Sequence, residues 1–526
     1  MANSAAFAEP VALESRPQRH LVASAIEGRD ALFLAELAQS QPIGELVHVA
    51  RDGPRAAHLA ELLKFFAPDL EVILLPAWDC LPYDRVSPNQ DVMAERLDAL
   101  ARLLDRDREV SSARQRIIIT TVNALLQKLP PPEVVRSGLF AAEAGERIDR
   151  EQLLVCLARN GYRRAGTVVE PGEYAVRGGI IDVYPTGSEQ PLRLDLFGDD
   201  LEAIRGFDPL TQRSLSRVAR FELRPVSEVL LDEGTIARFR VGYLQHFGAA
   251  TGDPLFESVC AGRPFPGMEH WLPLFHERLV GLDAYLQPGC PISFDHQAED
   301  VITARQELIG EHYESRRSPP EAARSMGATP YRPLRPDELY LSEHQILGLS
   351  ESRERFDLST FAAPPSSRSD VQVTDLETRT GREFAAERAR QDVNLFDQVA
   401  EHVAAERAAG RRVLIAAASD GSLERLRMVL QDHGVEASRK VEQWSEVEGG
   451  GETALAVLPL EHGFVTATHS ILAEPDIFGD RLARPTRRKR RADQFIAEVA
   501  ALAEGDLVVH NDHGIGRYDG LITLEI

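Results

Sequence analysis

The sequence predicts a multidomain α/β protein, and three observations lead to this prediction. The chain has 526 residues, too many for one hydrophobic core, and about 100–200 residues per domain implies several domains. Short apolar runs alternate with longer amphipathic segments, which favours parallel sheets covered by helices. A stretch rich in Pro and Ser at 361–370 divides the chain and is typical of a linker.

Composition and charge narrow the class of protein. Hydrophobic residues make up 43% and charged residues 27%, as in ordinary globular proteins, and no apolar run approaches the ~20 residues that span a bilayer. This lack of a spanning run leads us to expect no membrane partner. The four cysteines lie far apart without a C-x-x-C pair, which favours a reducing, cytoplasmic location. The net charge of −23 repels nucleic acid, so DNA contact is expected to be local or to need segments beyond this sequence.

The first half of the chain predicts a parallel-sheet domain that an α+β unit interrupts. After a loose tail at 1–24, residues 25–138 carry strand candidates at 46–49, 72–75 and 117–121 and helix candidates at 55–66 and 93–104. Asp149 is a suitable N-cap for a helix to about residue 160, and strand-like segments follow at 174–184, 192–205 and 216–223. We therefore predict an inserted α+β unit at 139–225, with 226–362 completing the first domain.

The second half predicts a smaller α/β domain and the start of another. After a linker at 363–384, helix, strand, helix and strand patterns at 385–409, 413–418, 423–432 and 454–458 predict a domain at 385–480. Residues 481–495 begin with the basic run RLARPTRRKRR, which we interpret as a linker, with contact to DNA or to another partner as the alternative. Residues 496–526 are too few to bury a core, so we expect this truncated segment to be unfolded or aggregation-prone, which proteolysis would test.

Motifs for catalysis are missing from the sequence. None of the four lysines follows a glycine, so the phosphate-binding G-x-x-x-x-G-K-[ST] does not occur, and the first strand-helix junction at 24–31 keeps a single glycine. His276 does not begin an H-E-x-x-H zinc motif, and no G-x-S-x-G is present. His510 and His513 are interpreted as polar residues at a turn. We expect no catalytic, cofactor-binding or metal-binding residue in this chain.

Several segments resemble one family of proteins. The segments are LPAWDCLPYD at 75–84, SPNQD at 87–91, GEYAVRGGIIDVYP at 172–185, FDPLT at 207–211, EHGF at 461–464, EPDIFG at 474–479, GDLVVH at 505–510 and HGIGRY at 513–518. Together and in this order they resemble the N-terminal part of the transcription-repair coupling factor (Mfd) family.

The resemblance carries implications for fold and function. It implies a degenerate helicase-like first domain, an inserted UvrB-type domain that binds UvrA, a small third domain and the start of a CarD-like domain that binds the RNA polymerase β subunit. Family members release RNA polymerase stalled at DNA lesions and recruit UvrA for nucleotide excision repair. Their ATP-dependent DNA translocase, which uses ATP and Mg, lies outside this sequence. The alternative is a UvrB-like helicase with an atypical nucleotide site.

Candidate docking residues lie along 192–197. Side chains alternate across a sheet, so Leu192, Leu194 and Leu196 should be core, whereas Arg193, Asp195 and Phe197 should face outward. An outward aromatic beside an arginine is typical of an interface hot spot.

The resemblance assigns UvrA contacts to Arg177, Arg193 and Phe197, and Leu524 is our candidate contact to RNA polymerase. The alternative for the first three is structural. In that case Phe197 packs on a neighbouring domain, and the arginines are solvated or pair with Asp195 or Glu202.

Overall fold

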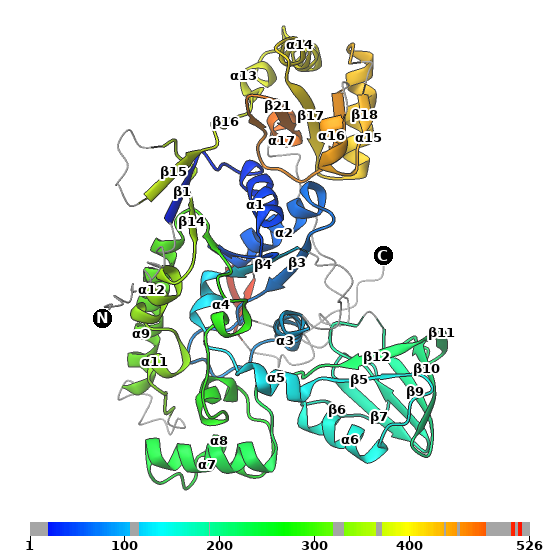
Figure 1. The fold of residues 1–526 in the computed structure, drawn as a ribbon, viewed down its shortest axis with the longest axis vertical. Helices are drawn as coiled ribbons and strands as arrows, with labels where there is room; N and C mark the ends of the chain where they lie inside the picture. Colours follow the sequence, from blue (N-terminus) through cyan, green and yellow to red (C-terminus); the bar gives the residue numbers. More distant parts are fainter. Residues whose placement is uncertain are drawn as a thin grey trace, which may run out of the picture.

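A computed structural model describes residues 19–105, 115–188, 190–318, 331–363, 371–435, 438–449, 453–479, 507–510 and 514–517 (Figure 1). The chain forms a multidomain α/β protein with several sheets, as the sequence predicts. Among the described residues no helix is both long and apolar enough to cross a membrane. The expected contact residue Leu524, the basic run at 481–495 and the first 18 residues of the expected tail lie outside the described residues.

The first sheet has seven parallel strands in the order β15-β1-β14-β13-β2-β4-β3. Its strands are β1 (Arg19–Ala23), β2 (Glu45–Ala50), β3 (Glu71–Leu75), β4 (Arg116–Thr121), β13 (Ile292–Phe294), β14 (Arg355–Leu358) and β15 (Val371–Asp375). Helices α1 (Arg29–Ser40) and α2 (Gly53–Phe66) pack on one face, and α3 (Gln90–Leu104), α4 (Val122–Leu126) and α12 (Glu343–Glu351) pack on the other. The predicted strands and helices between residues 46 and 121 are confirmed.

Two boundary predictions for this sheet are wrong. The loose tail was expected to reach residue 24, but Arg19–Ala23 form β1, which hydrogen-bonds to both β14 and β15. The linker was expected at 363–384, but Val371–Asp375 form β15 at the edge of the same sheet. Strand β1 (RHLVA) has only three consecutive apolar residues after two polar ones, and β15 (VQVTD) alternates, so neither shows the apolar run that marks a buried parallel strand.

The chain leaves the first sheet after β4 and returns to it at β13. The second sheet, with order β11-β10-β9-β8-β7-β6, forms in between. Its unit comprises β5 (Phe140–Glu143), α6 (Arg150–Arg159), β6 (Arg163–Arg164), β7 (Glu173–Arg177), β8 (Ile180–Val183), β9 (Leu192–Phe197), β10 (Asp200–Phe207), β11 (Ser214–Val218) and β12 (Arg220–Leu223). Asp149 caps α6 as predicted. The expected strand segments at 174–184 and 192–205 are each two strands of a hairpin, and 216–223 is divided between β11 and β12.

A helical layer of the first unit is built from helices that precede the second sheet, follow it, or follow β13. This layer contains α5 (Pro132–Gly138), α7 (Glu233–Phe247), α8 (Pro254–Cys260), η1 (Met268–Leu274), η2 (Leu282–Tyr285), α9 (Ala298–Arg317) and α11 (Pro336–Leu339). Trp78 and Tyr83, from the LPAWDCLPYD segment, are buried in its aromatic core beside Phe239 and Phe275. The two aromatic side chains of this segment therefore pack the interior.

The third sheet has the order β16-β20-β21-β17-β19-β18. Its unit comprises β16 (Arg379–Thr380), α13 (Ala385–Arg388), α14 (Leu395–Ala408), β17 (Arg412–Ala417), α15 (Asp420–Asp432), β18 (Ser438–Lys440), α16 (Trp444–Gly449), β19 (Thr453–Val457), β20 (Phe464–Val465), β21 (His469–Ala473) and α17 (Glu474–Phe478). The single helix expected at 385–409 is two helices, because Asn394 caps a new start and its side chain accepts the N–H of Phe396. Ser419 caps α15, and its side chain accepts the N–H of Ser422.

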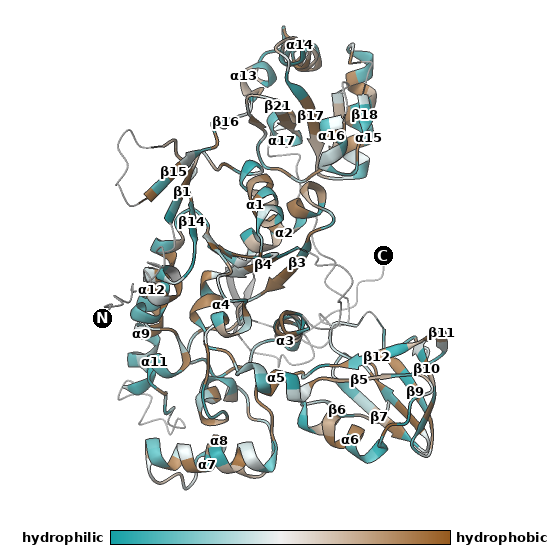
Figure 2. Cartoon of the chain, viewed as in Figure 1, coloured by the Kyte–Doolittle hydropathy of each residue, from teal (hydrophilic) through white to brown (hydrophobic). Residues whose placement is uncertain are grey.

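The first and third units share one hydrophobic core, which we call the joint. It contains residues of α1 and α2 from the first unit together with Trp444, Leu460 and Phe464 from the third. Phe66 and Trp444 meet edge to face at 5.4 Å between ring centroids. In Figure 1 the third unit stacks on α1 and α2, and Figure 2 shows apolar strands such as β3 and β17 in contrast to the hydrophilic outer helix α9. Near the end of the chain, β22 (Leu507–His510) and β23 (Gly514–Arg517) form a hairpin.

Candidate docking surface

The second sheet presents one apolar and one charged face. Leu192, Leu194 and Leu196 of β9 are buried against α6, whereas Arg193, Asp195 and Phe197 lie on the opposite side, which we call the outer face. The predicted alternation is therefore confirmed. Strand β9 pairs with β8 and β10 on either side, so this alternation extends over neighbouring strands in register.

Phe197 is the most prominent apolar side chain of the outer face. Its exposed fraction is 75%, so the alternative in which it packs against a neighbouring domain is wrong for the described residues. It ends β9 opposite Asp200, and the two-residue turn between them begins with Gly198 at φ +66°. This left-handed conformation suits glycine and gives the tight hairpin that leaves the ring in solvent. Single exposed apolar side chains are common on protein surfaces, so the role of this ring depends on the residues around it.

Arg193 is held by a carboxylate that the sequence did not identify. Its Nε and Nη2 donate to Asp182 Oδ1 and Oδ2 at 2.7 and 2.9 Å, and its guanidinium lies 4.7 Å from the centroid of the Phe207 ring. These hydrogen bonds raise the pKa of Arg193 above its ordinary value. The expected partners were Asp195 or Glu202, so this part of the structural alternative is corrected to Asp182, which neighbours Arg193 on β8. Arg193 thus has a structural role whatever it binds.

Arg177 lies at the end of β7 and is exposed. Its Nη2 donates to the Gly166 carbonyl at 2.9 Å and to Thr167 Oγ1 at 3.2 Å, which fixes the loop before β7. Arg177 pairs with Ile180, and Ile180 pairs with Asp195, so all three lie on the outer face. The structure therefore brings Arg177, Arg193 and Phe197 to one face from β7 and β9.

Two further arginines lie on the outer face, and the sequence analysis did not single them out. Arg205 of β10 is paired with Arg193 in register and forms an ion pair with Asp195 at 3.1 Å. Arg217 of β11 is in turn paired with Arg205. The alternation of side chains was visible in the sequence, but which residues of different strands lie side by side depends on register, which the sequence left open.

The junction of β1 and α1 is the place where a helicase-like domain would hold nucleotide phosphates. Here Asp30 is buried with Arg55, which also contacts Asp295 at 3.3 Å. Burial, opposed by Arg55, raises the pKa of Asp30 to about 6. The guanidinium of Arg55 is therefore already neutralised by the carboxylates of Asp30 and Asp295.

The same junction is covered by the third unit. Glu27 accepts hydrogen bonds from His58 Nε2 at 2.8 Å and from the Glu461 N–H at 3.1 Å. Gly28 has φ +81°, and a Cβ there would lie 2.8 Å from the Phe464 ring. A phosphate at this junction would meet carboxylates and an aromatic ring where a nucleotide site offers backbone N–H groups and a lysine.

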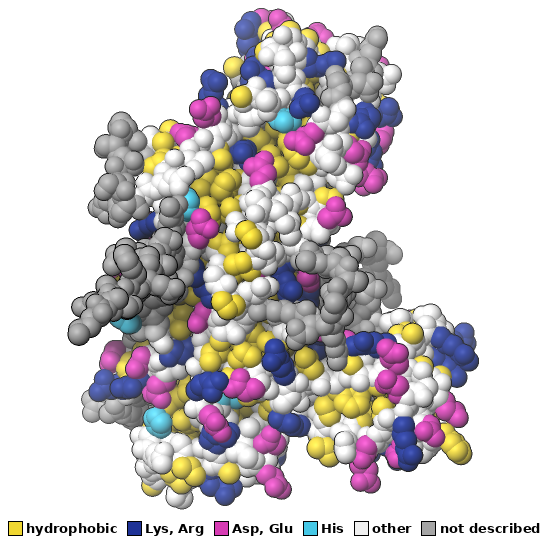
Figure 3. Space-filling model, in the orientation of Figure 1, with side chains coloured by type: hydrophobic (Ala, Val, Ile, Leu, Met, Phe, Trp, Pro, Cys, Tyr) yellow, Lys and Arg dark blue, Asp and Glu magenta, His cyan; other side chains and the backbone are white. Residues whose placement is uncertain are grey.

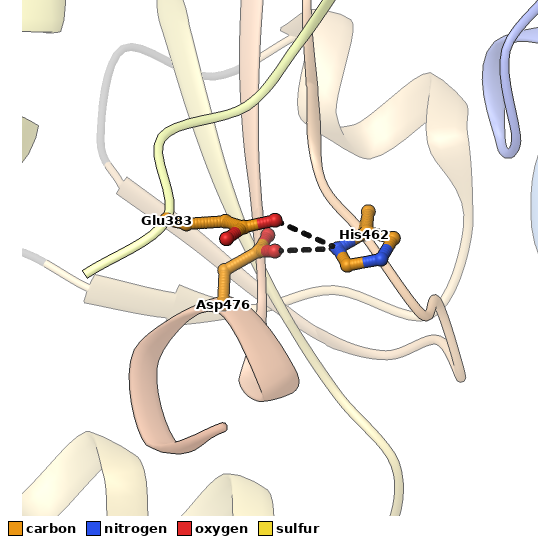
Figure 4. Close-up of side chains that lie close together, drawn as sticks. All are labelled: Glu383, His462 and Asp476. Atoms are coloured by element: carbon orange, nitrogen blue, oxygen red, sulfur yellow. Dashed lines mark hydrogen bonds and ion pairs between the residues drawn. The ribbon is translucent and has the colours of Figure 1, made fainter. Parts of the chain in front are cut away.

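A side-chain cluster of Glu383, His462 and Asp476 lies in the third unit (Figure 4). His462 Nδ1 lies 3.1 Å from Asp476 Oδ1 and 3.7 Å from Glu383 Oε1. Burial disfavours the protonated ring, but Asp476 and then Glu383 hold the pKa of His462 above its ordinary value. Asp476 Oδ2 also accepts the N–H groups of Gly463 and Ala473. The cluster ties the loop after β19 to α17.

Comparisons with known proteins agree with this division of the chain. Residues 140–228 match the UvrB interaction domain, residues 407–477 match the MFD D3 domain, and residues 502–526 match the CarD-like/TRCF RID domain. A transcription-repair-coupling factor of Haemophilus influenzae is 30% identical over 532 residues, covering 99% of this chain and 44% of that protein. The chain corresponds to the N-terminal part of the transcription-repair coupling factors.

Two further relatives support this identification across bacteria. The transcription-repair-coupling factor of Escherichia coli is 30% identical over 508 residues, covering 94% of this chain and 41% of that protein. That of Bacillus subtilis is 24% identical over 490 residues, covering 90% and 39%. The chain thus spans less than half the length of these coupling factors. The outer face with Arg177, Arg193 and Phe197 lies within the region that matches the UvrB interaction domain.

Proposed function

We propose that this chain is the partner-docking part of a transcription-repair coupling factor. In this proposal the inserted α+β unit recruits UvrA through Arg177, Arg193 and Phe197. The rest of the protein recognises RNA polymerase stalled at a DNA lesion and releases it with ATP and Mg. The observation that carries the proposal is the 75% exposed Phe197 beside a row of arginines, within the region that matches the UvrB interaction domain.

Phe197 provides the test, because its exposed ring contributes little to folding. Phe197→Ala should weaken UvrA binding by about 2 kcal/mol or more, as expected for a central aromatic hot spot, which is at least a 20-fold rise in Kd. Isothermal calorimetry with purified UvrA measures this, and thermal unfolding checks the fold. Val155→Ala is the matched control, because Val155 is also exposed but lies on α6, which covers the inner face. Equal affinities of the wild type and Phe197→Ala would contradict the proposed face.

We further propose that residues 496–526 begin the surface that binds the RNA polymerase β subunit, with Leu524 as a contact. The match of residues 502–526 to the CarD-like/TRCF RID domain supports this. Capture of the β subunit by the wild type and by Leu524→Glu tests it, and equal capture by both would remove Leu524 from the contact.

The second candidate is a UvrB-like helicase with an atypical nucleotide site. The carboxylates Glu27 and Asp30 and the covering Phe464 at the β1–α1 junction disfavour it. A nucleotide present at 100 times its Kd stabilises the folded state by roughly 2.7 kcal/mol. Thermal unfolding with and without ATP and Mg therefore separates the candidates, since a docking module should show no shift.

A further inference from the structure

The outer face carries three arginines side by side on three neighbouring strands. Register pairs Arg193 of β9 with Arg205 of β10, and Arg205 with Arg217 of β11. Neighbouring strands lie about 4.8 Å apart, so the row is about 10 Å long. The row is unusual in a chain whose net charge is −23. Figure 3 shows Lys and Arg side chains gathered over the outer end of the second sheet, near β10 and β11.

The three arginines differ in how their charge is compensated. Arg193 is bound by the buried Asp182, and Arg205 pairs with Asp195. Arg217 is exposed and forms no ion pair with any residue that the structure describes. Like charges directly opposite each other in a sheet are destabilising, so Arg217 opposite Arg205 costs free energy in the isolated chain. An acidic partner surface would remove this cost.

Strand β11 also offers apolar contact and a free edge. Leu215, two residues before Arg217 on the same strand, has an exposed fraction of 60%. Four of the five residues of β11 are exposed, and within the described residues the strand pairs with β10 alone. A long exposed edge strand favours pairing with another chain, and an arginine on it discourages indiscriminate pairing.

The size of a normal interface connects β11 to the proposed docking residues. Arg193 and Phe197 are four residues apart on β9, or about 13 Å along the strand. A standard interface buries about 800 Å² on each partner, which is a patch about 30 Å across. A partner that contacts both Arg193 and Phe197 therefore also covers Arg217, two strands away from Arg193.

We propose that β11 extends the docking face, with Arg217 and Leu215 meeting an acidic surface of the partner with an apolar contact beside it. This inference rests on the proposed binding of UvrA to the outer face. Arg217 lies at the rim, where charges mainly act on the rate of association and on its salt dependence. Phe197 is the apolar anchor and acts mainly on dissociation.

Charge reversal at Arg217 should slow the binding of UvrA without lowering the stability of the fold. Arg217→Glu places a carboxylate opposite Arg205, so the variant should fold at least as stably as the wild type. Its association rate constant with purified UvrA at low salt should fall about tenfold, and it should depend less steeply on salt. Surface plasmon resonance measures both rates. Arg220→Glu is the control, because it changes the net charge equally but lies on β12, outside the second sheet.

The outcomes distinguish this inference from the function on which it rests. A slower association for Arg217→Glu, with Arg220→Glu like the wild type, supports the extended face. If Arg217→Glu and Leu215→Ala both bind like the wild type while Phe197→Ala loses affinity, the proposed function stands and the extension to β11 is overturned. If the wild type itself does not bind UvrA, the proposed function fails and the extension fails with it.

Discussion

Arg193 lies on the outer face and is also the counter-ion of a carboxylate that water does not reach. Asp182 has a side-chain exposure of 1%, and its two oxygens accept hydrogen bonds from Nε and Nη2 of Arg193. Removing one member of a buried ion pair leaves the other charged and unsolvated, which costs more than the pair itself contributes. A binding defect of Arg193→Ala is therefore ambiguous unless stability is measured too.

A double-variant cycle resolves the two roles of Arg193. Arg193→Gln alone should lower the free energy of unfolding by about 3 kcal/mol, because Asp182 is left as an unpaired buried charge. Adding Asp182→Asn should restore most of this loss, since a neutral amide can bond to the Gln side chain. Urea unfolding measures both effects. If the double variant is folded but still binds UvrA weakly, Arg193 contacts the partner; full recovery of binding would make its role purely structural.

At the scale of helices and strands, the sequence predicts the elements that short-range patterns determine. The apolar runs of β2, β3 and β4 and the Asp149 cap of α6 could be recognised because each signal lies within a few consecutive residues. Strands β1 and β15 were missed because they pair with each other across about 350 residues of chain, which no local pattern reveals. Alternation along one strand predicted the outward position of Phe197. The Asp182–Arg193 pair could not be predicted in this way, because it depends on the register of β8 and β9.

The pairing of β2 with β13 predicts a pH dependence of stability. His48 and Ser293 are register partners, and His48 Nδ1 lies 3.2 Å from Ser293 Oγ with the ring fully buried. Burial lowers the pKa of His48 to about 4, whereas an unfolded histidine has a pKa of about 6.5. Between these values the unfolded chain binds a proton that the folded chain excludes. The stability present above pH 6.5 is therefore lost as the pH falls toward 4.

The variant His48→Gln tests both the direction and the size of this pH dependence of stability. Lowering the pH from 7 to 5 should cost the wild type about 2 kcal/mol at this one site, on top of contributions from other groups. The variant should lose about that much less over the same interval, whatever its stability at pH 7. Urea unfolding at both pH values gives the comparison. Equal losses for the two proteins would show that His48 does not exclude its proton.

At the scale of the whole molecule, the joint makes the first and third units one cooperative body. Phe464 belongs to β20 of the third sheet, yet its ring packs against Gly28 at the start of α1 and is fully buried. Separating the units would expose this ring together with Leu460 and Trp444, which are packed in the same core as α1 and α2. The free energy of burying large apolar side chains therefore opposes unfolding of either unit alone. The junction that holds phosphates in a nucleotide-binding domain serves here as an attachment point for the third unit.

This coupling predicts how the chain unfolds. In the wild type, peptides 453–473 and 116–126 should lose protection from hydrogen exchange at the same urea concentration. Phe464→Ala removes about 3–5 kcal/mol of packing from the joint, so the third unit should unfold first and the first unit should keep nearly its own midpoint. Phe384→Ala is the control, because Phe384 is equally buried but lies in the separate core of the third unit. With the joint intact, that variant should lower both midpoints together. Two separate transitions already present in the wild type, or one shared transition in Phe464→Ala, would contradict coupling through Phe464.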